Sequence, residues 1–158
     1  MMAAGSSNPT KMTASVPASA GKVLLIDDDD LIAGCLRQYL AQQGCAVDVA
    51  LEQVTAERLM RGGAYRVIVV DPFFTGGVHG MSEGLLASIP LLQPEAEVMV
   101  VTGYGSSEMW QLAAAPRLSI HAKPQPVAAL GELIFAALAA PARFPSHVVT
   151  PSSQELNS

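Results

Sequence analysis

Acidic residues gather at the ends of two apolar segments of this sequence. Four consecutive aspartates, Asp27–Asp30, follow the apolar run at 22–26, and Asp71 follows the run at 66–70. Two carboxylates about 4 Å apart repel each other by roughly 4 kcal/mol at a protein-like dielectric constant near 20. A fold that brings these acids together therefore requires a cation or hydrogen-bond donors to offset the repulsion.

Two later β-type runs are also followed by polar residues. Thr102 and Gly103 follow the run at 97–101, and Lys123 follows the run at 118–122. A metal ion, a hydroxyl group and an ammonium around a carboxylate are the groups needed to transfer and hold a phosphoryl group. Carboxylate oxygens suit Mg²⁺, which typically takes one or two protein carboxylates and keeps several waters. These residue types indicate phosphoryl chemistry at a magnesium site.

Each of these residues also has a simpler interpretation. Acids after a strand can cap the following helix, because the positive end of the helix dipole favours them. We favour this capping role for Asp29 and Asp30, whereas for the other three acids the two interpretations are balanced. A threonine at a strand end and a surface lysine are both ordinary features, so the specific signal is the whole set in this order.

Short apolar segments alternate with helical patterns between residues 22 and 140. The predicted strands are 22–26, 46–50, 66–70, 97–101 and 118–122. The predicted helices between and after them lie near 32–40, 51–61, 82–92, 106–114 and 130–138.

Two of these helices have a clear apolar face. In the first, Ile32, Leu36, Tyr39 and Leu40 share a face, and Gly44 stands where a left-handed cap ends a helix. The corresponding residues of the last helix are Leu130, Leu133, Ile134 and Leu138.

The alternation predicts a doubly wound α/β domain, with a five-stranded parallel sheet and helices on both faces. Nearly continuous apolar strands are typical of parallel sheets that are covered on both sides. Ligands of such domains bind beyond the carboxyl ends of the strands. The acids, the hydroxyl and the lysine are all expected at that edge.

Composition limits the other possibilities. The chain has 158 residues and half are hydrophobic, which favours one domain at 22–140 between poorly ordered tails at 1–21 and 141–158. The formal net charge is −5, without a basic cluster, which argues against direct nucleic-acid binding. Two cysteines, Cys35 and Cys45, make no disulfide framework. With neither a signal peptide nor a membrane span expected, we predict a cytoplasmic protein.

Residues 22–140 resemble the receiver domain of two-component response regulators. The resemblance is to stand-alone receivers, and it implies a flavodoxin-like strand order, 2-1-3-4-5. The features that carry it are the acidic pair Asp27 and Asp28, the strand-end Asp71, Thr102 before a small residue, and Lys123 before Pro124.

The resemblance implies a role for each residue around the phosphoryl group. Asp71 would be the phosphoacceptor and would form an aspartyl phosphate. Lys123 would pair with the phosphoryl group, and Thr102 would move to hydrogen-bond it as part of a switch. The backbone N–H groups of Phe73 and Gly103 would bind phosphate, and the peptide bond after Lys123 would be cis.

The resemblance also implies the ligands of Mg²⁺. Asp28 and Asp71 would bind the ion directly, together with the backbone carbonyl of Phe73. Asp27 would act through a water molecule.

The sequence departs from the family at three positions. Pro72 follows Asp71 where the family usually has Leu, and Thr75 stands where the family has a proline. The aromatic switch residue of the family is replaced by Ile120, while Tyr104 is a nearby aromatic that could take its place.

Three function classes follow from these residues. The leading one is a phosphorylatable receiver in a two-component system or phosphorelay, which takes phosphate from a sensor histidine kinase or a histidine phosphotransfer protein. It would signal by altered binding to a downstream protein and would not be a turnover enzyme. The second is a receiver-like interaction module that is not phosphorylated. The third, a phosphohydrolase of the haloacid dehalogenase type, is disfavoured because it needs an Asp where Phe73 stands.

Overall fold

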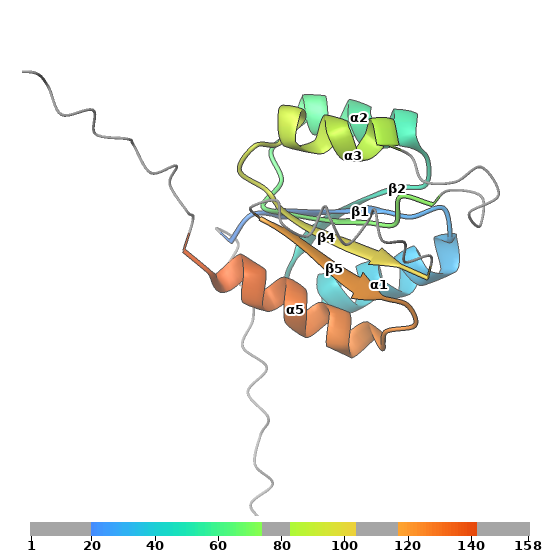
Figure 1. Cartoon of the computed structure of the whole chain (residues 1–158). Helices are drawn as coiled ribbons and strands as arrows, with labels where there is room; N and C mark the ends of the chain where they lie inside the picture. The colour runs from blue at the N-terminus through green and yellow to red at the C-terminus, as the bar shows by residue number, and fades with distance from the viewer. Residues whose placement is uncertain (1–19, 74–82, 104–116, 142–158) are drawn as a thin grey trace, which may run out of the picture.

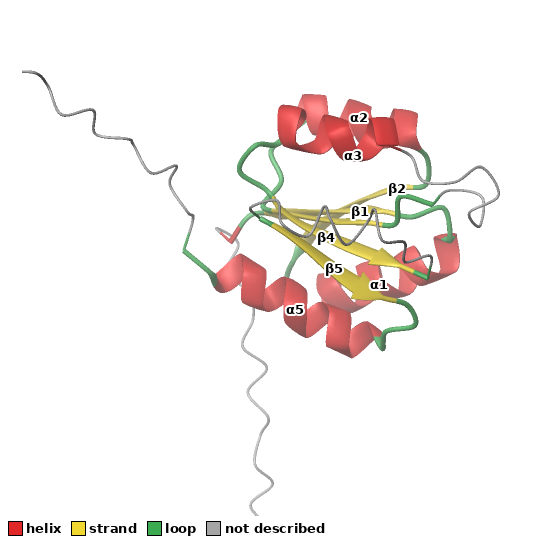
Figure 2. Ribbon diagram, viewed as in Figure 1, coloured by secondary structure: helices red, strands yellow, loops and turns green. Residues whose placement is uncertain are grey.

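The computed structural model describes residues 20–73, 83–103 and 117–141. These residues form three layers, with a central sheet between two pairs of helices (Figures 1 and 2). The predicted tails, the predicted helix at 106–114 and Tyr104 lie outside the described residues, apart from the inner ends of the tails.

Five parallel strands form one sheet in the order β2-β1-β3-β4-β5. The predicted fold class and strand order are confirmed. Three strands have the predicted bounds, β3 begins one residue later than expected, and β4 extends to include Thr102. The strands are Lys22–Ile26 (β1), Ala46–Ala50 (β2), Val67–Val70 (β3), Glu97–Thr102 (β4) and Leu118–Ala122 (β5).

Four helices in the described residues cover both faces of the sheet. In Figure 1, α1 and α5 lie on one face, and α2 and α3 lie together on the other. Within the described ranges, no helix is both long enough and apolar enough to cross a bilayer. The helices are Asp30–Gln42 (α1), Gln53–Gly62 (α2), Glu83–Leu92 (α3) and Val127–Ala139 (α5).

The acids at the start of α1 act as predicted for helix capping. The side chain of Asp29 accepts a hydrogen bond from the backbone N–H of Ile32 at 3.1 Å, and Asp30 lies in the first turn. Both positions favour a negative charge, because the N–H groups of the first turn are otherwise unsatisfied. At the other end of α1, Gly44 has a φ of +90°, which confirms the predicted left-handed cap.

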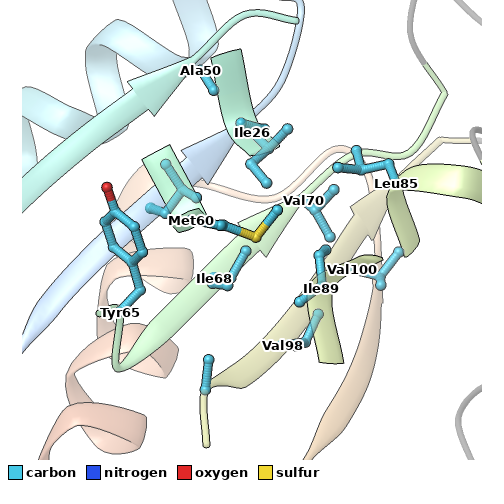
Figure 3. Packing of buried hydrophobic residues seen from close by; sticks show 13 residues of the cluster. Ile26, Ala50, Met60, Tyr65, Ile68, Val70, Leu85, Ile89, Val98 and Val100 are labelled. Atoms are coloured by element: carbon cyan, nitrogen blue, oxygen red, sulfur yellow. The ribbon is translucent and has the colours of Figure 1, made fainter. Parts of the chain in front are cut away.

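Alternating strand residues divide the core into two clusters, one on each face of the sheet. The first cluster lies beneath α2 and α3. Figure 3 shows Leu85 and Ile89 of α3 pointing towards Val70 and Val100 of the strands. The second cluster lies beneath α1 and α5, and Leu36, Leu40, Val69, Val101, Leu130 and Ile134 belong to it.

Two residues predicted on buried helix faces are partly exposed. Ile32 is 39% exposed because it lies in the first turn of α1, at the edge of the sheet. Leu133 is 37% exposed because it lines an open groove of about 380 Å³ between α5 and strands β4 and β5. The apolar faces of both helices are therefore narrower than the sequence pattern indicates.

Helices α1 and α5 touch at a glycine. A Cβ atom at Gly131 of α5 would collide with the ring of Tyr39 from α1. That ring also stacks on Phe135, with a centroid distance of 6.2 Å and an interplanar angle of 29°. Gly131 therefore allows the close approach that seats Tyr39 between the two helices.

We predict that Gly131→Ala lowers the free energy of unfolding by about 1–3 kcal/mol, because the added methyl group overpacks the contact with Tyr39. Gly34 is the matched control, since it is also inside a helix but a Cβ there meets nothing within 4 Å. Gly34→Ala should stabilise the protein by about 0.5–1 kcal/mol through helix propensity. Urea unfolding of both variants measures the difference, and equal effects would contradict the close approach.

Candidate functional site

Two of the predicted acids follow neighbouring strands of the sheet. Ile26 of β1 and Val70 of β3 are paired in register, so Asp27 and Asp71 leave the sheet side by side. The backbone N–H of Asp71 continues the ladder by donating to the carbonyl of Ile26 at 2.9 Å. Neighbouring strands lie only about 4.8 Å apart, so the register alone brings the two carboxylates together.

Lys123 reaches both acids from the end of β5. Its backbone N–H donates to the carbonyl of Thr102 at 2.9 Å, which fixes the chain beyond the last ladder pair. The Lys123–Pro124 peptide bond is cis, as expected. The Nζ atom of Lys123 lies 2.8 Å from Oδ2 of Asp27 and 2.9 Å from Oδ2 of Asp71. One ammonium therefore forms salt bridges with two carboxylates.

The second oxygen of each carboxylate accepts a backbone hydrogen bond. Asp27 Oδ1 accepts from the N–H of Asp29, and Asp71 Oδ1 accepts from the N–H of Phe73, both at 3.0 Å. Each aspartate thus closes a turn with the residue two positions later, which fixes its orientation. Pro72 has no N–H to donate, but the donor that follows it is retained.

The charges of this cluster are only partly balanced. Burial raises the pKa of Asp27, and the nearby Asp71 charge adds to this, although hydrogen bonds from Lys123 and Asp29 act in the opposite direction. For Lys123, burial acts to lower the pKa, but the hydrogen bonds to Asp27 and Asp71 and the charges of these two acids together outweigh it, so the pKa is raised. Lys123 therefore stays charged, while the two acids favour a further cation.

Thr102 and Gly103 lie next to Lys123. Thr102 is the last residue of β4 and is 3% exposed, so it is buried at the end of the strand. Gly103 is exposed, and a Cβ there would lie 4.0 Å from Cβ of Lys123. The ends of β4 and β5 are thus as close as the sequence predicted.

The acids face the α1 and α5 side of the sheet. A small cavity of about 30 Å³ borders Asp27, Asp71 and Lys123, and its apolar walls include Leu36 of α1 and Leu130 of α5.

Comparison with known proteins gives a family for this arrangement. No protein-family model matches the sequence, and no curated protein matches it. Among solved structures, a response regulator protein from Burkholderia pseudomallei is 32% identical, with a TM-score of 0.61. That crystal structure contains a phosphorylated aspartic acid, a calcium ion and citrate. The match covers 75% of this chain and 66% of the Burkholderia chain.

Two further structures agree with this match. A CheY-like receiver domain protein from Methanospirillum hungatei JF-1 is 24% identical, with a TM-score of 0.65, over 75% of this chain and 93% of its own. The beryllofluoride-activated NtrC4 receiver domain dimer is 25% identical, with a TM-score of 0.61, over 74% of this chain and 94% of its own. The chain belongs to the receiver-domain family of response regulators.

Asp28 and Ile120, two further residues predicted for the receiver site, are not the partners of Lys123 in its two salt bridges. Asp28 follows Asp27 and its side chain is exposed at the sheet edge. Ile120, at the switch position, is half-buried in β5 and packs against the cluster beneath α2 and α3. Tyr104 falls outside the described ranges, so its proposed switch role stays a prediction.

The chemistry of the donor set fits a hard divalent cation. Asp27, Asp28 and Asp71 offer carboxylate oxygens at one edge of the receiver, and the carbonyl of Phe73 follows in the same loop. Among the described residues, no three acidic, His or Cys side chains already stand together as a metal site. Mg²⁺ does not require three, because it commonly takes one or two carboxylates and completes its shell with water and phosphate oxygens.

The sequence did not indicate where the ring of Phe73 lies. It is half-buried and packs against the cluster beneath α2 and α3, on the opposite side of the sheet from the acids. A bulky apolar residue two positions after a buried acid is the signal that could have indicated this. The chain therefore crosses the edge of the sheet between Asp71 and Phe73.

We predict that Lys123→Met destabilises the receiver by about 2 kcal/mol in the presence of a chelator. Removing one partner of a buried ion pair costs about 3–5 kcal/mol. The loss should be smaller here because the Lys123 side chain is 22% exposed. Urea unfolding at neutral pH gives the value.

The double variant Lys123→Met/Asp27→Asn tests the cause of this loss. Removing one of the two facing charges should recover part of the stability, because Asp71 then meets a neutral amide. An additive loss in the double variant would mean that repulsion between Asp27 and Asp71 is not the cause.

Proposed function

We propose that this receiver is a phosphoacceptor that takes a phosphoryl group onto Asp71. The donor is a phosphohistidine of a sensor histidine kinase or of a histidine phosphotransfer protein. The observation that carries the proposal is the placement of Lys123, whose ammonium forms salt bridges with both Asp71 and Asp27. A positive charge already held at the acceptor carboxylate is what an incoming phosphoryl group needs.

The transfer is a displacement at phosphorus. An oxygen of Asp71 forms a bond to phosphorus, the P–N bond of the phosphohistidine breaks, and its electron pair stays on the imidazole nitrogen. Lys123 then pairs with the phosphoryl oxygens. The backbone N–H groups of Phe73 and Gly103 and the hydroxyl of Thr102 supply hydrogen bonds. Positioning and charge stabilisation provide most of the catalysis in reactions of this type.

Mg²⁺ is the proposed cofactor. Asp28, Asp71 and the carbonyl of Phe73 would hold it, with Asp27 acting through water. When bound, the ion supplies charge neutralisation for the transferred group. The Burkholderia response regulator was solved with a phosphorylated aspartic acid and a calcium ion, which supports a role for a divalent cation in this chain.

A receiver-like module that is not phosphorylated is the second candidate. Ile120 at the switch position and Pro72 after the acceptor favour it. The hydrogen bonds and salt bridges around Asp71 weigh against it, because a module without phosphate chemistry has no need of this set. The haloacid dehalogenase reading lacks its second acid, since Phe73 occupies that position and packs into the core.

The proposed output is a changed protein-binding surface, and the protein is not a turnover enzyme. Receiver domains act in signalling, and the partner here would be a downstream protein. We place the protein in the cytoplasm, which agrees with the free thiols of Cys35 and Cys45.

The first test is the site of phosphorylation. After incubation with Mg²⁺ and acetyl phosphate, the intact mass of the wild type should rise by one phosphoryl group, and Asp71→Asn should show no adduct. Asp29→Asn is the control, because it changes a nearby acid that caps α1 and should leave the adduct unchanged. Equal labelling of wild type and Asp71→Asn would refute the assignment, and an unlabelled wild type would favour the unphosphorylated module.

The second test is the metal. A ligand that binds only the folded state raises its stability by mass action, so millimolar Mg²⁺ should raise the melting temperature. Asp28→Ala should remove most of this shift, whereas Asp30→Ala, an exposed acid in the first turn of α1, should keep it. If Asp28→Ala keeps the full shift, the proposed ligands are wrong.

A further inference from the structure

We propose that Phe73 couples phosphorylation of Asp71 to the packing of α3. The inference rests on the proposed function and adds the route by which the phosphoryl group changes the rest of the receiver. It arises from the placement of two residues, because the acceptor and the ring two residues later lie on opposite faces of the sheet.

The first step is the hydrogen bond between the two residues. The N–H of Phe73 donates to Oδ1 of Asp71, and Lys123 donates to Oδ2. Phosphorylation turns one of these oxygens into the bridging oxygen of an acyl phosphate and removes the carboxylate charge. Lys123 still has Asp27 as a partner, whereas Phe73 must move its N–H towards a phosphoryl oxygen to keep a charged acceptor.

The second step is the stiffness of the link. Pro72 is buried between the two residues, and its ring fixes φ near −65°. A displacement of the Phe73 backbone therefore cannot be absorbed by rotation at that bond. With one rotation fewer in the link, more of the displacement is passed to the ring of Phe73.

The third step is what the ring touches. Phe73 packs against the hydrophobic cluster to which α3 contributes Leu85 and Ile89. Figure 3 shows Leu85 beside Val70, the residue directly before Asp71. Closely packed cores respond to small shifts of a side chain. A ring drawn outward by the phosphoryl group loosens the contacts that hold α3 on the sheet.

Ile120 does not explain the coupling equally well. Ile120 packs against the same cluster from β5. The hydrogen bonds of Asp71, however, join it to Phe73 and to Lys123, and Lys123 lies three residues beyond Ile120. An aliphatic side chain at this position also lacks the hydroxyl or ring that could respond to a change in polarity. Phe73 combines a backbone bond to the acceptor with a ring in the core.

The experiment measures amide hydrogen exchange of α3 in the full chain, with and without acetyl phosphate and Mg²⁺, while intact mass follows the adduct. In the wild type, phosphorylation should speed exchange at residues 85–92 by about threefold or more, because local opening follows the packing of the helix. In Phe73→Ala, exchange is compared only for the molecules whose intact mass shows the adduct, and in these the phosphate-dependent change in α3 should be lost.

Two control variants separate coupling from loss of packing. Leu59→Ala removes a side chain of α2 that packs against the same cluster, and Ile120→Val trims the switch position. Both should keep the phosphate-dependent change in α3. Phe73→Val replaces Phe73→Ala if the latter does not fold, and it should lose most of the change.

Two results would overturn the coupling while leaving the phosphoacceptor role intact. One is a fully labelled wild type whose α3 exchange is unchanged. The other is a labelled Phe73→Ala variant that keeps the wild-type change. A wild type that forms no adduct contradicts the proposed function itself, and the coupling falls with it.

Discussion

One ammonium shared by two carboxylates is the interaction on which the rest of this site depends. Asp27 and Asp71 leave adjacent strands in register, so the sheet forces their charges together whether or not a ligand is present. Lys123 offsets that repulsion from a third strand, and all three side chains are largely shielded from water. The salt bridges of Lys123 therefore stabilise the edge of the sheet, and its ammonium is already in place to bind an anion.

The order of the strands explains why the contact spans so much of the sequence. Lys123 lies 96 residues from Asp27 and 52 from Asp71, yet the sheet places the end of β5 close to both. The acids need only a backbone turn of two residues each to fix their orientation. The position of Lys123 depends on the pairing of the strands across the sheet, so its ion pairs depend on the complete fold.

Much of the fold could be predicted from the sequence because the signals are local. The bounds of β1, β2 and β5 follow from short β-type runs in the sequence, and Asp29 and Gly44 mark the ends of α1 through capping chemistry. The strand order came from the resemblance to receivers. The convergence of Asp27, Asp71 and Lys123 followed from the rule that ligands bind at the carboxyl ends of parallel strands.

The structural features that could not be predicted from the sequence depend on contacts between distant segments. Periodicity assigns Leu133 to the apolar face of its helix, but in the structure Leu133 lines a groove together with residues of β4 and β5. The sharing of Lys123 between two acids depends on its rotamer. The side on which Phe73 packs depends on the path of the chain around Pro72.

The contact between α1 and α5 also constrains how this sequence can change over time. Gly131 has no side chain, and the ring of Tyr39 fills the space that a side chain there would take. These two residues come from helices about ninety residues apart in the chain, so their substitutions are not independent. If a larger residue is to replace Gly131, a smaller residue must replace Tyr39 so that the two helices still pack closely. A smaller residue at position 39 leaves Phe135 without its stacking partner. Substitutions at these three positions are therefore epistatic, and their order of appearance is restricted by packing rather than by signalling.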